Sequence, residues 1–239
     1  MFDYKVILNL LGDLYDASTD VEKWQPFLEK LAAVFDAKAS QIGHHNLKYE
    51  KLTFNLMHGI EFDPVKAKRY EELLSGDPQV SYGYENPEKP YTPRMFMSED
   101  QIHQTPMYEE MMVPSGIEYT MCVTMLDGPE SASFLILGRS IDQEPFSRED
   151  RDFLSELVPH IRRALRLHKN FSVLDFHRAV TFGTLDQFAM GIFIIDQNRK
   201  LIFGNDAANH LVEEGDGIRL FNDNIVLESI GDTNKLNQA

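Results

Sequence analysis

The sequence predicts an α+β protein in which two modules are joined by one long helix. Three observations support this class. Residues 1–146 combine helical and strand patterns, residues 147–183 carry a continuous amphipathic helical pattern, and residues 184–239 begin a second strand–turn–strand–helix unit. A chain of 239 residues has room for two such modules with buried cores.

Composition narrows the classes of function. With 43% hydrophobic and 26% charged residues the chain has the balance of a globular protein, and no apolar run approaches the roughly 20 residues of a membrane helix. The first residues lack the basic and apolar regions of a signal peptide. We therefore expect a cytoplasmic protein with no membrane partner.

The net charge and the cysteine count exclude further classes. Because DNA affinity depends largely on Lys and Arg that neutralise phosphates, a net charge of −15 predicts that this stretch of chain does not itself bind nucleic acid. Cys122 is the one cysteine, which excludes intrachain disulfides and cysteine-built metal cages.

The N-terminal segment predicts two helices. The first carries an apolar stripe at helical spacing, formed by Ile7, Leu10, Leu11 and Leu14. The second follows Thr19-Asp20-Val21-Glu22, where a hydroxyl and a carboxylate have capping-box spacing. Pro26 interrupts its pattern, so we expect a short turn from Asp20 to precede the helix.

Two pairs of strands are predicted in the first module. Residues 39–43 and 52–57 alternate moderately, and residues 119–126 and 133–137 flank the turn Asp127-Gly128-Pro129-Glu130. The alternation in the second pair sorts its first strand into two faces. One face holds Thr120, Cys122 and Thr124, and the other holds Tyr119, Met121, Val123 and Met125.

Helix signals separate these strand pairs. Asp63-Pro64 predicts a helix that ends at Gly76-Asp77-Pro78, and Ser98 and Thr105-Pro106 predict two short ones. Residues 77–97 hold several prolines among tyrosines, so we expect a long loop that packs through its aromatic side chains.

A long helix is predicted from about Arg148 to about Val180, starting at a capping box formed by Ser147 and Asp150. Pro159 predicts a kink or a new start. Because the apolar stripe is close to heptad spacing, we expect it to join two copies of the chain. The residues assigned to this homodimer contact are Leu154, Leu157, Ile161, Leu165, His168 and Phe171.

The second module begins with an apolar run at residues 191–196, a polar turn at 197–200 and a second run at 201–203. Asn205 then predicts the cap of an amphipathic helix. Residues 218–220 and 225–227 form a hairpin candidate around Asn222-Asp223-Asn224.

Several motifs together resemble a known family. They are Leu14-Tyr15-Asp16-Ala17-Ser18 with Trp24, Asp77-Pro78-Gln79-Val80, Arg94-Met95-Phe96-Met97-Ser98, Pro145-Phe146-Ser147 and the run from Leu157 to Leu165. The chain is similar over nearly its whole length to the sensory half of bacterial LuxR-type helix-turn-helix regulators. Phe203, Asn205 and Ala208 also match the pattern of a PAS domain.

The resemblance implies a GAF-like antiparallel sheet flanked by helices over residues 1–146, a linker and dimerisation helix over 147–183, and the first part of a PAS-like domain over 184–239. It also implies a C-terminal DNA-binding domain beyond Ala239. We expect either an excised fragment or a naturally short product, and the sequence leaves this choice open.

Aromatic and methionine residues of the first module suggest a ligand pocket, because such pockets have apolar walls with few polar groups. The candidate lining is Tyr82, Tyr84, Met95, Phe96, Tyr108, Tyr119 and Met121. The alternative is that these side chains are ordinary core, with methionine filling irregular gaps.

No pattern indicates catalytic residues, a metal or a cofactor. Adjacent residues of a strand point to opposite faces, so His44 and His45 do not suit one metal ion, and we expect them at an exposed strand end. Cys122 lies in an apolar strand without basic neighbours in sequence, which favours a buried inert thiol over a redox sensor.

We therefore predict a non-enzymatic region that senses a small molecule and dimerises, with DNA bound only by a domain outside this chain. The alternative is a freestanding protein that binds another regulator through its acidic surface or an unpaired sheet edge. A continuing reading frame with a basic helix-turn-helix would favour the first, and a stop codon after Ala239 the second.

Overall fold

The computed structural model describes residues 4–46, 51–196, 200–215, 217–221 and 224–227, without the side chains of 173–184. The chain divides into two compact units, Met1–Asn170 and Phe171–Ala239. The α+β class that we predicted is confirmed. Among the described residues, no helix combines the length and apolar character needed to cross a membrane.

The first unit is built on a four-stranded antiparallel sheet with the strand order β2-β1-β4-β3. Its strands are β1 (Ala39–Asn46), β2 (Lys51–His58), β3 (Tyr119–Leu126) and β4 (Ser131–Arg139). Both predicted strand pairs are confirmed, and their antiparallel pairing places the β1–β4 contact at the centre of the sheet.

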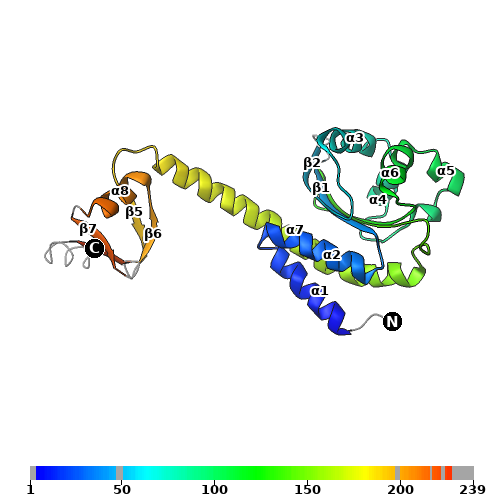
Figure 1. The fold of residues 1–239 in the computed structure, drawn as a ribbon, viewed down its shortest axis with the longest axis horizontal. Coiled ribbons are helices and arrows are strands. Elements are labelled where there is room, and N and C mark those ends of the chain that lie inside the picture. Colours follow the sequence, from blue (N-terminus) through cyan, green and yellow to red (C-terminus); the bar gives the residue numbers. More distant parts are fainter. Residues whose placement is uncertain (1–3, 47–50, 197–199, 216, 222–223, 228–239) are drawn as a thin grey trace. The chain divides into compact units, whose positions relative to one another are not determined.

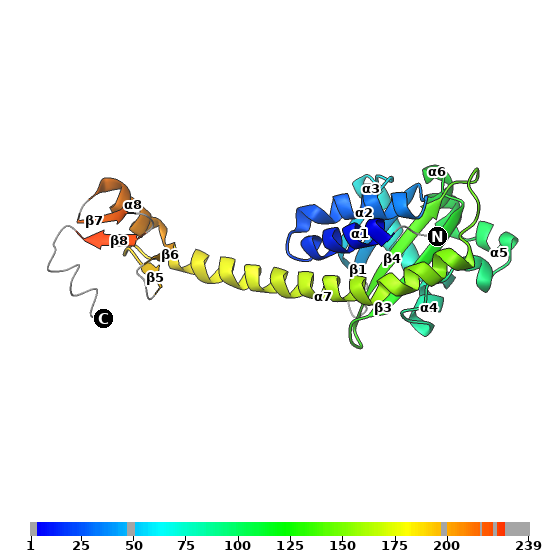
Figure 2. The ribbon, with the colours of Figure 1, turned by 90° about the horizontal axis from the view of Figure 1, so that it is seen from below.

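Helices flank the two faces of this sheet, as Figures 1 and 2 show. One face carries α1 (Tyr4–Ala17), α2 (Trp24–Val34) and the beginning of α7 (Arg148–Leu185). The other face is covered by α3 (Pro64–Leu74), α4 (Pro78–Glu85), α5 (Glu99–His103) and α6 (Val113–Ser115). A π-helical turn, Tyr108–Met112, leads directly into α6.

Most of the predicted helix starts are confirmed. Asp63 caps α3, and Ser98 exchanges hydrogen bonds with Gln101 as a capping box at α5. Ser147 and Asp150 bond each other's backbone amides at the start of α7. The short turn before α2 is also present (Val21–Lys23), although its cap is Asp20 rather than Thr19.

Our prediction of one long loop over residues 77–97 was wrong. Its first part is α4, because Asp77 accepts a hydrogen bond from the Gln79 amide at 2.8 Å and Pro78 occupies the first helical position. Pro93–Met95 adds a short 3₁₀ turn. We took the prolines as a sign of a loop, whereas Pro78 and Pro93 stand at the starts of helical segments.

The main core lies between the sheet and the helices α1, α2 and α7. It includes Trp24, Phe27, Leu31, Phe35, Met121, Val123, Leu135 and Leu137. The same core contains Leu154, Leu157, Ile161 and Leu165, which we had assigned to a dimer contact. Each buried leucine or isoleucine stabilises the fold by about 2 kcal/mol, so withdrawing four would cost on the order of 8 kcal/mol.

That cost is comparable to the whole stability of a typical domain. The stripe therefore packs in the core of one subunit, and these four residues have little surface left for contact with a second copy. His168 is likewise half-buried against Trp24 and Phe54, with ring centroids 5.7 and 5.1 Å away. Phe171 alone of the predicted set is exposed, at 41%. Dimerisation itself stays a prediction.

Helix α7 continues through Pro159 rather than beginning there. Its first half belongs to the first unit. The predicted linker segment (147–183) therefore begins with residues that pack in the core of the first unit, so the helix does more than connect two modules.

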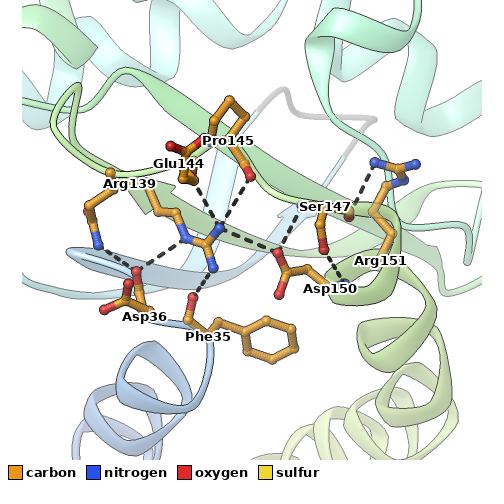
Figure 3. A network of polar contacts seen from close by, with 9 residues as sticks. Phe35, Asp36, Arg139, Glu144, Pro145, Ser147, Asp150 and Arg151 are labelled. Carbon is orange, nitrogen blue, oxygen red and sulfur yellow. Dashed lines mark hydrogen bonds and ion pairs between the residues drawn. The ribbon is translucent and has the colours of Figure 1, made fainter. Parts of the chain in front are cut away.

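Arg139, at the end of β4, ties the end of α2 to the start of α7 (Figure 3). Its buried guanidinium donates to the carbonyl oxygens of Phe35, Asp36 and Glu144 and pairs with the Asp150 carboxylate at 3.3 Å. It also lies over the Phe146 ring, with the guanidinium carbon 4.1 Å from the centroid. One planar cation thus binds backbone oxygens from two segments and a carboxylate from a third, which a lysine could not do.

We predict that Arg139→Ala lowers the free energy of unfolding by about 3 kcal/mol or more, because it leaves the partly buried Asp150 carboxylate and several carbonyl oxygens without their donor. Chemical denaturation of the full chain measures this. Arg148→Ala is the matched control, since its ion pair with Asp152 is solvent-exposed and should contribute little. Equal small losses for both variants would contradict the assignment.

The second unit begins with the antiparallel pair β5 (Phe193–Ile195) and β6 (Leu201–Gly204), followed by α8 (Asp206–Glu214). A hairpin of β7 (Ile218–Phe221) and β8 (Asn224–Leu227) follows. The strand–strand–helix order and the hairpin are as we predicted. Residues 197–199 and 222–223 of the expected turns lie outside the described residues.

Asn205 organises this unit from a fully buried position. Its Oδ1 accepts from the amides of Ala208 and Ile192, at 3.0 and 2.8 Å. Its Nδ2 donates to the carbonyl oxygens of Leu185 and Met190, each at 2.9 Å. The predicted cap of α8 therefore also fixes the end of α7 and the residues that lead into β5.

We predict that Asn205→Asp destabilises this unit by about 2 kcal/mol, although aspartate caps helices well, because a carboxylate cannot donate to the two carbonyl oxygens. Hydrogen exchange of residues 191–195 and 201–214 in the full chain measures it. Asn209→Asp, which alters one exposed hydrogen bond to Gly204, is the control and should leave exchange nearly unchanged. Unchanged protection in Asn205→Asp would contradict the role given to Nδ2.

Candidate ligand-binding site

A cavity of about 120 Å³ lies between the sheet and the helices that cover its second face. Its floor is the face of β3 that carries Thr120, Cys122 and Thr124, together with Ala132, Ile136 and Gly138 of β4. Its roof comes from α3, α4 and the π-helical turn, through Tyr70, Leu74, Val80, Tyr84, Met111 and Met112. The two-faced pattern that we predicted for β3 thus places Thr120, Cys122 and Thr124 on the cavity side, although Val123 of the core face also borders the cavity.

Two glycines allow neighbouring groups to approach closely on this side of the sheet. At Gly43, an added Cβ would lie 2.3 Å from the Phe134 ring, so the glycine makes room for that ring on the sheet. At Gly83, an added Cβ would lie 2.2 Å from Thr124 Oγ1 and 2.7 Å from the Tyr91 hydroxyl. Gly83 therefore allows α4 to approach β3 closely.

The lining combines apolar walls with a few fixed polar groups. The apolar part includes Met57, Ile60, Phe62, Met107 and Ile117. Tyr84 Oη lies 2.8 Å from His45 Nδ1, and Tyr91 Oη donates to the Gln79 carbonyl at 2.7 Å. Burial raises the pKa of Tyr84 to about 12, so its hydroxyl stays protonated at neutral pH. This is the usual composition of a small-molecule site.

Asp77 is the carboxylate of the cavity lining, and it is buried. Burial raises the pKa of this carboxyl, and the hydrogen bond from the Gln79 amide opposes the rise only in part. No Lys or Arg is among the described residues that line the cavity. The described cavity lining therefore holds a carboxylate with no lysine or arginine beside it.

Cys122 also faces the cavity, and its thiol is unreactive by environment. Burial, with a further contribution from the Asp77 carboxylate, raises the pKa of this thiol to about 12. The thiolate, which is the nucleophile, is therefore scarce at neutral pH. This agrees with the buried inert thiol that we expected.

A second hollow, of about 280 Å³, opens beside the start of β3. Its walls include Arg94, His103, Glu118, Tyr119 and Arg151. The Arg94 guanidinium carbon lies 4.4 Å from the Tyr119 ring centroid, which orients the guanidinium by a cation–π contact. Apolar surface comes from Met95, Ile102, Met112 and Phe146.

Glu99, His103 and Glu118 have the ligand types of a metal site, with candidate ligand atoms within 4.8 Å of one another. Arg94 pairs with both carboxylates, which places a positive charge where an ion would have to bind. Glu118 also accepts from Tyr108 at 2.6 Å and lies 3.0 Å from His103. Burial alone would raise the pKa of Glu118, but these partners hold it below its usual range. The cluster is a self-contained ion-pair network.

The seven residues that we predicted for one pocket are dispersed. Tyr84 lines the cavity, and Met95 and Tyr119 line the second hollow. Tyr82 and Phe96 stack on each other, with ring centroids 3.9 Å apart. Tyr108 bonds Glu118 instead. Met121 is fully buried in the core on the opposite face of the sheet, as the alternation of β3 requires.

The sequence did not lead us to the polar residues that line the cavity. Asp77 was read as the end of a helix and as part of a motif shared with a known family, but not as a pocket residue, although an Asp-Pro pair is also a helix-start signal. His45 was expected to be exposed, yet it is buried beside Tyr84, and His44 lies 3.1 Å from Ser133 Oγ. Their assignment to opposite faces holds, since only His45 lines the cavity.

Solved structures of similar shape are known. The LBD domain of VqsR from Pseudomonas aeruginosa aligns with a TM-score of 0.53 and 17% identity, over 68% of this chain and 96% of that one. The N-acylhomoserine lactone dependent LuxR family factor CepR2 from Burkholderia cenocepacia gives 0.48 and 15%, over 66% and 92%. A GAF domain/HD domain protein from Geobacter sulfurreducens gives 0.46 and 13%, over 67% and 99%.

At these identities the similarity to VqsR establishes a shared fold for the covered part of the chain. No protein-family model and no curated protein matches the sequence. The resemblance to LuxR-type sensory regions, which we inferred from motifs, is therefore supported at the level of fold.

We predict that N-ethylmaleimide modifies Cys122 of the native protein slowly, with a rate that still rises about tenfold per pH unit above pH 9, because its pKa is raised to about 12. Mass spectrometry of the modified full chain measures the rate. In urea the rate should level off near the ordinary thiol value of 9.0. A native rate that also levels off near 9 would contradict the burial of this thiol.

Proposed function

We propose that this chain is the signal-receiving region of a LuxR-type transcription regulator, and that a small molecule binds in the 120 Å³ cavity of the first unit. The observation that carries the proposal is the buried Asp77 carboxylate in an otherwise neutral, mostly apolar lining. A buried charge without a cationic partner is costly, and the hydrogen bond from the Gln79 amide offsets only part of that cost, so a ligand donor would stabilise the carboxylate further.

The chemistry of the lining favours a ligand with an apolar body and at least one N–H or O–H donor. Its donor would bind the Asp77 carboxylate, while Tyr84 and Tyr91 offer hydroxyls to its other polar atoms. An anionic group beside Asp77 would be repelled, because the described lining has no Lys or Arg to offset it. The proposed role is sensing rather than catalysis.

The sheet gives a route for the signal. On β3 the cavity-facing residues alternate with Met121 and Val123, which belong to the same core as Leu154 and Leu157 of α7. Displacement of β3 by a ligand would therefore be felt by the start of α7. We propose that α7 passes this change to a PAS-like second unit, in a homodimer whose DNA-binding domains lie outside this chain.

We predict that protein purified from its host carries a small-molecule adduct in native mass spectrometry, and that Asp77→Asn lowers the bound fraction about tenfold, since a hydrogen bond to a charged group contributes about 1.5–3 kcal/mol. Asn still caps α4, so the fold should be kept. Asp63→Asn is the matched control, because Asp63-Pro64 starts α3 in the same way but is solvent-exposed.

The proposal fails if the wild type carries no adduct and its melting temperature is not raised by small-molecule extracts of the host. It also fails if the adduct survives equally in Asp77→Asn and in Asp63→Asn, because binding would then not involve the cavity carboxylate.

A further inference from the structure

The Asp77 carboxylate is buried in the cavity lining, and the described residues use only part of its capacity to accept hydrogen bonds. Asp77 is 6% exposed, and its Oδ1 accepts from the Gln79 amide at 2.8 Å. No Lys or Arg stands among the described residues of this lining. A carboxylate has about four acceptor positions, so most of them are left for a molecule in the cavity.

The charge of Asp77 acts across the lining. Burial raises the pKa of Tyr70, Tyr91 and Cys122, and the Asp77 carboxylate raises each of them further. Tyr70 belongs to the roof and Cys122 to the floor, so the negative potential reaches both sides of the cavity. A cation placed in this space is attracted to the carboxylate, and an anion is repelled.

Several hydroxyl groups of the lining have already donated their hydrogens within the protein. Tyr91 donates to the Gln79 carbonyl at 2.7 Å, and Thr120 donates to Gln79 Oε1 at 3.2 Å. Tyr70 donates to Gln41 Oε1 at 3.2 Å. A hydroxyl that has donated its hydrogen can still accept, because its oxygen keeps lone pairs. These three groups therefore meet a ligand as acceptors.

Gln79 holds the acceptors of α4 and β3 together. Its backbone amide binds Asp77, its carbonyl binds Tyr91 and its side-chain oxygen binds Thr120. Its side-chain nitrogen has no partner among the described residues, so it adds a neutral donor to the site. The fixed groups around Asp77 thus offer mostly oxygen lone pairs, which suit a ligand group with several N–H donors.

We propose that the ligand of the cavity is a protonated amine with an apolar body, whose ammonium group binds the Asp77 carboxylate. This inference rests on the proposed function of the cavity and names the class of its ligand. A primary ammonium group has three N–H donors, so it can bind hydroxyl oxygens such as those of Tyr91 and Thr120 as well as the carboxylate. A neutral donor would supply a hydrogen bond but no opposite charge.

The ammonium group must leave water to enter the cavity, and this cost is recovered only where the charge is both paired and hydrogen-bonded. The carboxylate meets the first condition and the hydroxyl oxygens meet the second. The rest of the lining receives the apolar body through side chains such as Phe62, Leu74 and Met111. A cavity of about 150 Å³ in another protein holds benzene, so six-carbon probes suit this cavity of about 120 Å³.

The test compares hexylamine, hexan-1-ol and hexanoate by calorimetry with the full chain at neutral pH, where an alkylamine is protonated. We expect hexylamine to bind at least tenfold more tightly than hexan-1-ol, because hydrogen bonds between charged groups are the stronger ones. Hexanoate should bind more weakly than either, since its charge has the same sign as that of Asp77.

Asp77→Asn should reduce the preference for the amine over the alcohol to about twofold or less, while Asn still caps α4. Asp63→Asn is the matched control, because it removes the same charge from a solvent-exposed helix start. It should keep the full preference. The two variants have equal net charge, so non-specific attraction of the amine to an acidic protein cannot produce a difference between them.

Methyl NMR of the full chain locates the bound amine. Hexylamine should shift the methyl signals of Met107 and Met111, which line the cavity, and leave that of Met125 in the core of the opposite face unchanged. Hexylamine that shifts neither cavity methionine would overturn the inference.

Hexan-1-ol that binds as tightly as hexylamine would overturn the inference and leave the proposed function intact, since a neutral ligand would still occupy the cavity. A preference for the amine that survives in Asp77→Asn would overturn it too. The proposed function itself is tested separately, by the adduct of the purified protein, whatever the charge of that adduct.

Discussion

The alternation of side chains along β3 and β4 is the constraint on which the first unit depends. Residues such as Met121, Val123, Leu135 and Leu137 face α1, α2 and α7 and are fully buried, while Thr120, Cys122, Thr124 and Ala132 face the other way. Successive side chains of a strand point to opposite faces of the sheet, so each residue faces one side or the other. One face is therefore close-packed, and the face with small and polar residues retains a cavity under α3, α4 and the π-helical turn. Arg139 secures this arrangement where the sheet meets α2 and α7.

This constraint also decides what α7 can do. An apolar stripe at near-heptad spacing fits a coiled coil and fits the back of a sheet equally well, because both need apolar residues every three or four positions. The closed core of the first unit takes up Leu154, Leu157, Ile161 and Leu165. Helix α7 is thus structurally part of the first unit at one end, and at its other end Asn205 binds the Leu185 carbonyl within the second unit.

Local signals predicted much of the fold. Caps at Asp63, Ser98, Ser147 and Asn205, and the β3–β4 turn, depend on neighbours within a few residues and could be read directly. The site could not be read in this way. Tyr84 and Met121 look alike as apolar candidates, and only the pairing of β3 in the sheet places Met121 on the far face. The Asp77 carboxylate is a candidate binding group because it is buried. That burial arises because α4 packs on β3 at Gly83.

A cavity lies on one face of the sheet, whereas Met121 and Met125, among the described residues, are packed in the core of the opposite face. Methyl NMR of methionine-labelled protein under xenon pressure tests this contrast most directly, because xenon enters dry apolar cavities and shifts adjacent methyl signals. The methyls of Met57, Met107, Met111 and Met112 line the cavity, whereas Met121 and Met125 lie in the core of the opposite face. We predict saturable shifts for the first group and none for the second. Shifts confined to Met121 and Met125, or no saturable shift at all, would contradict the account.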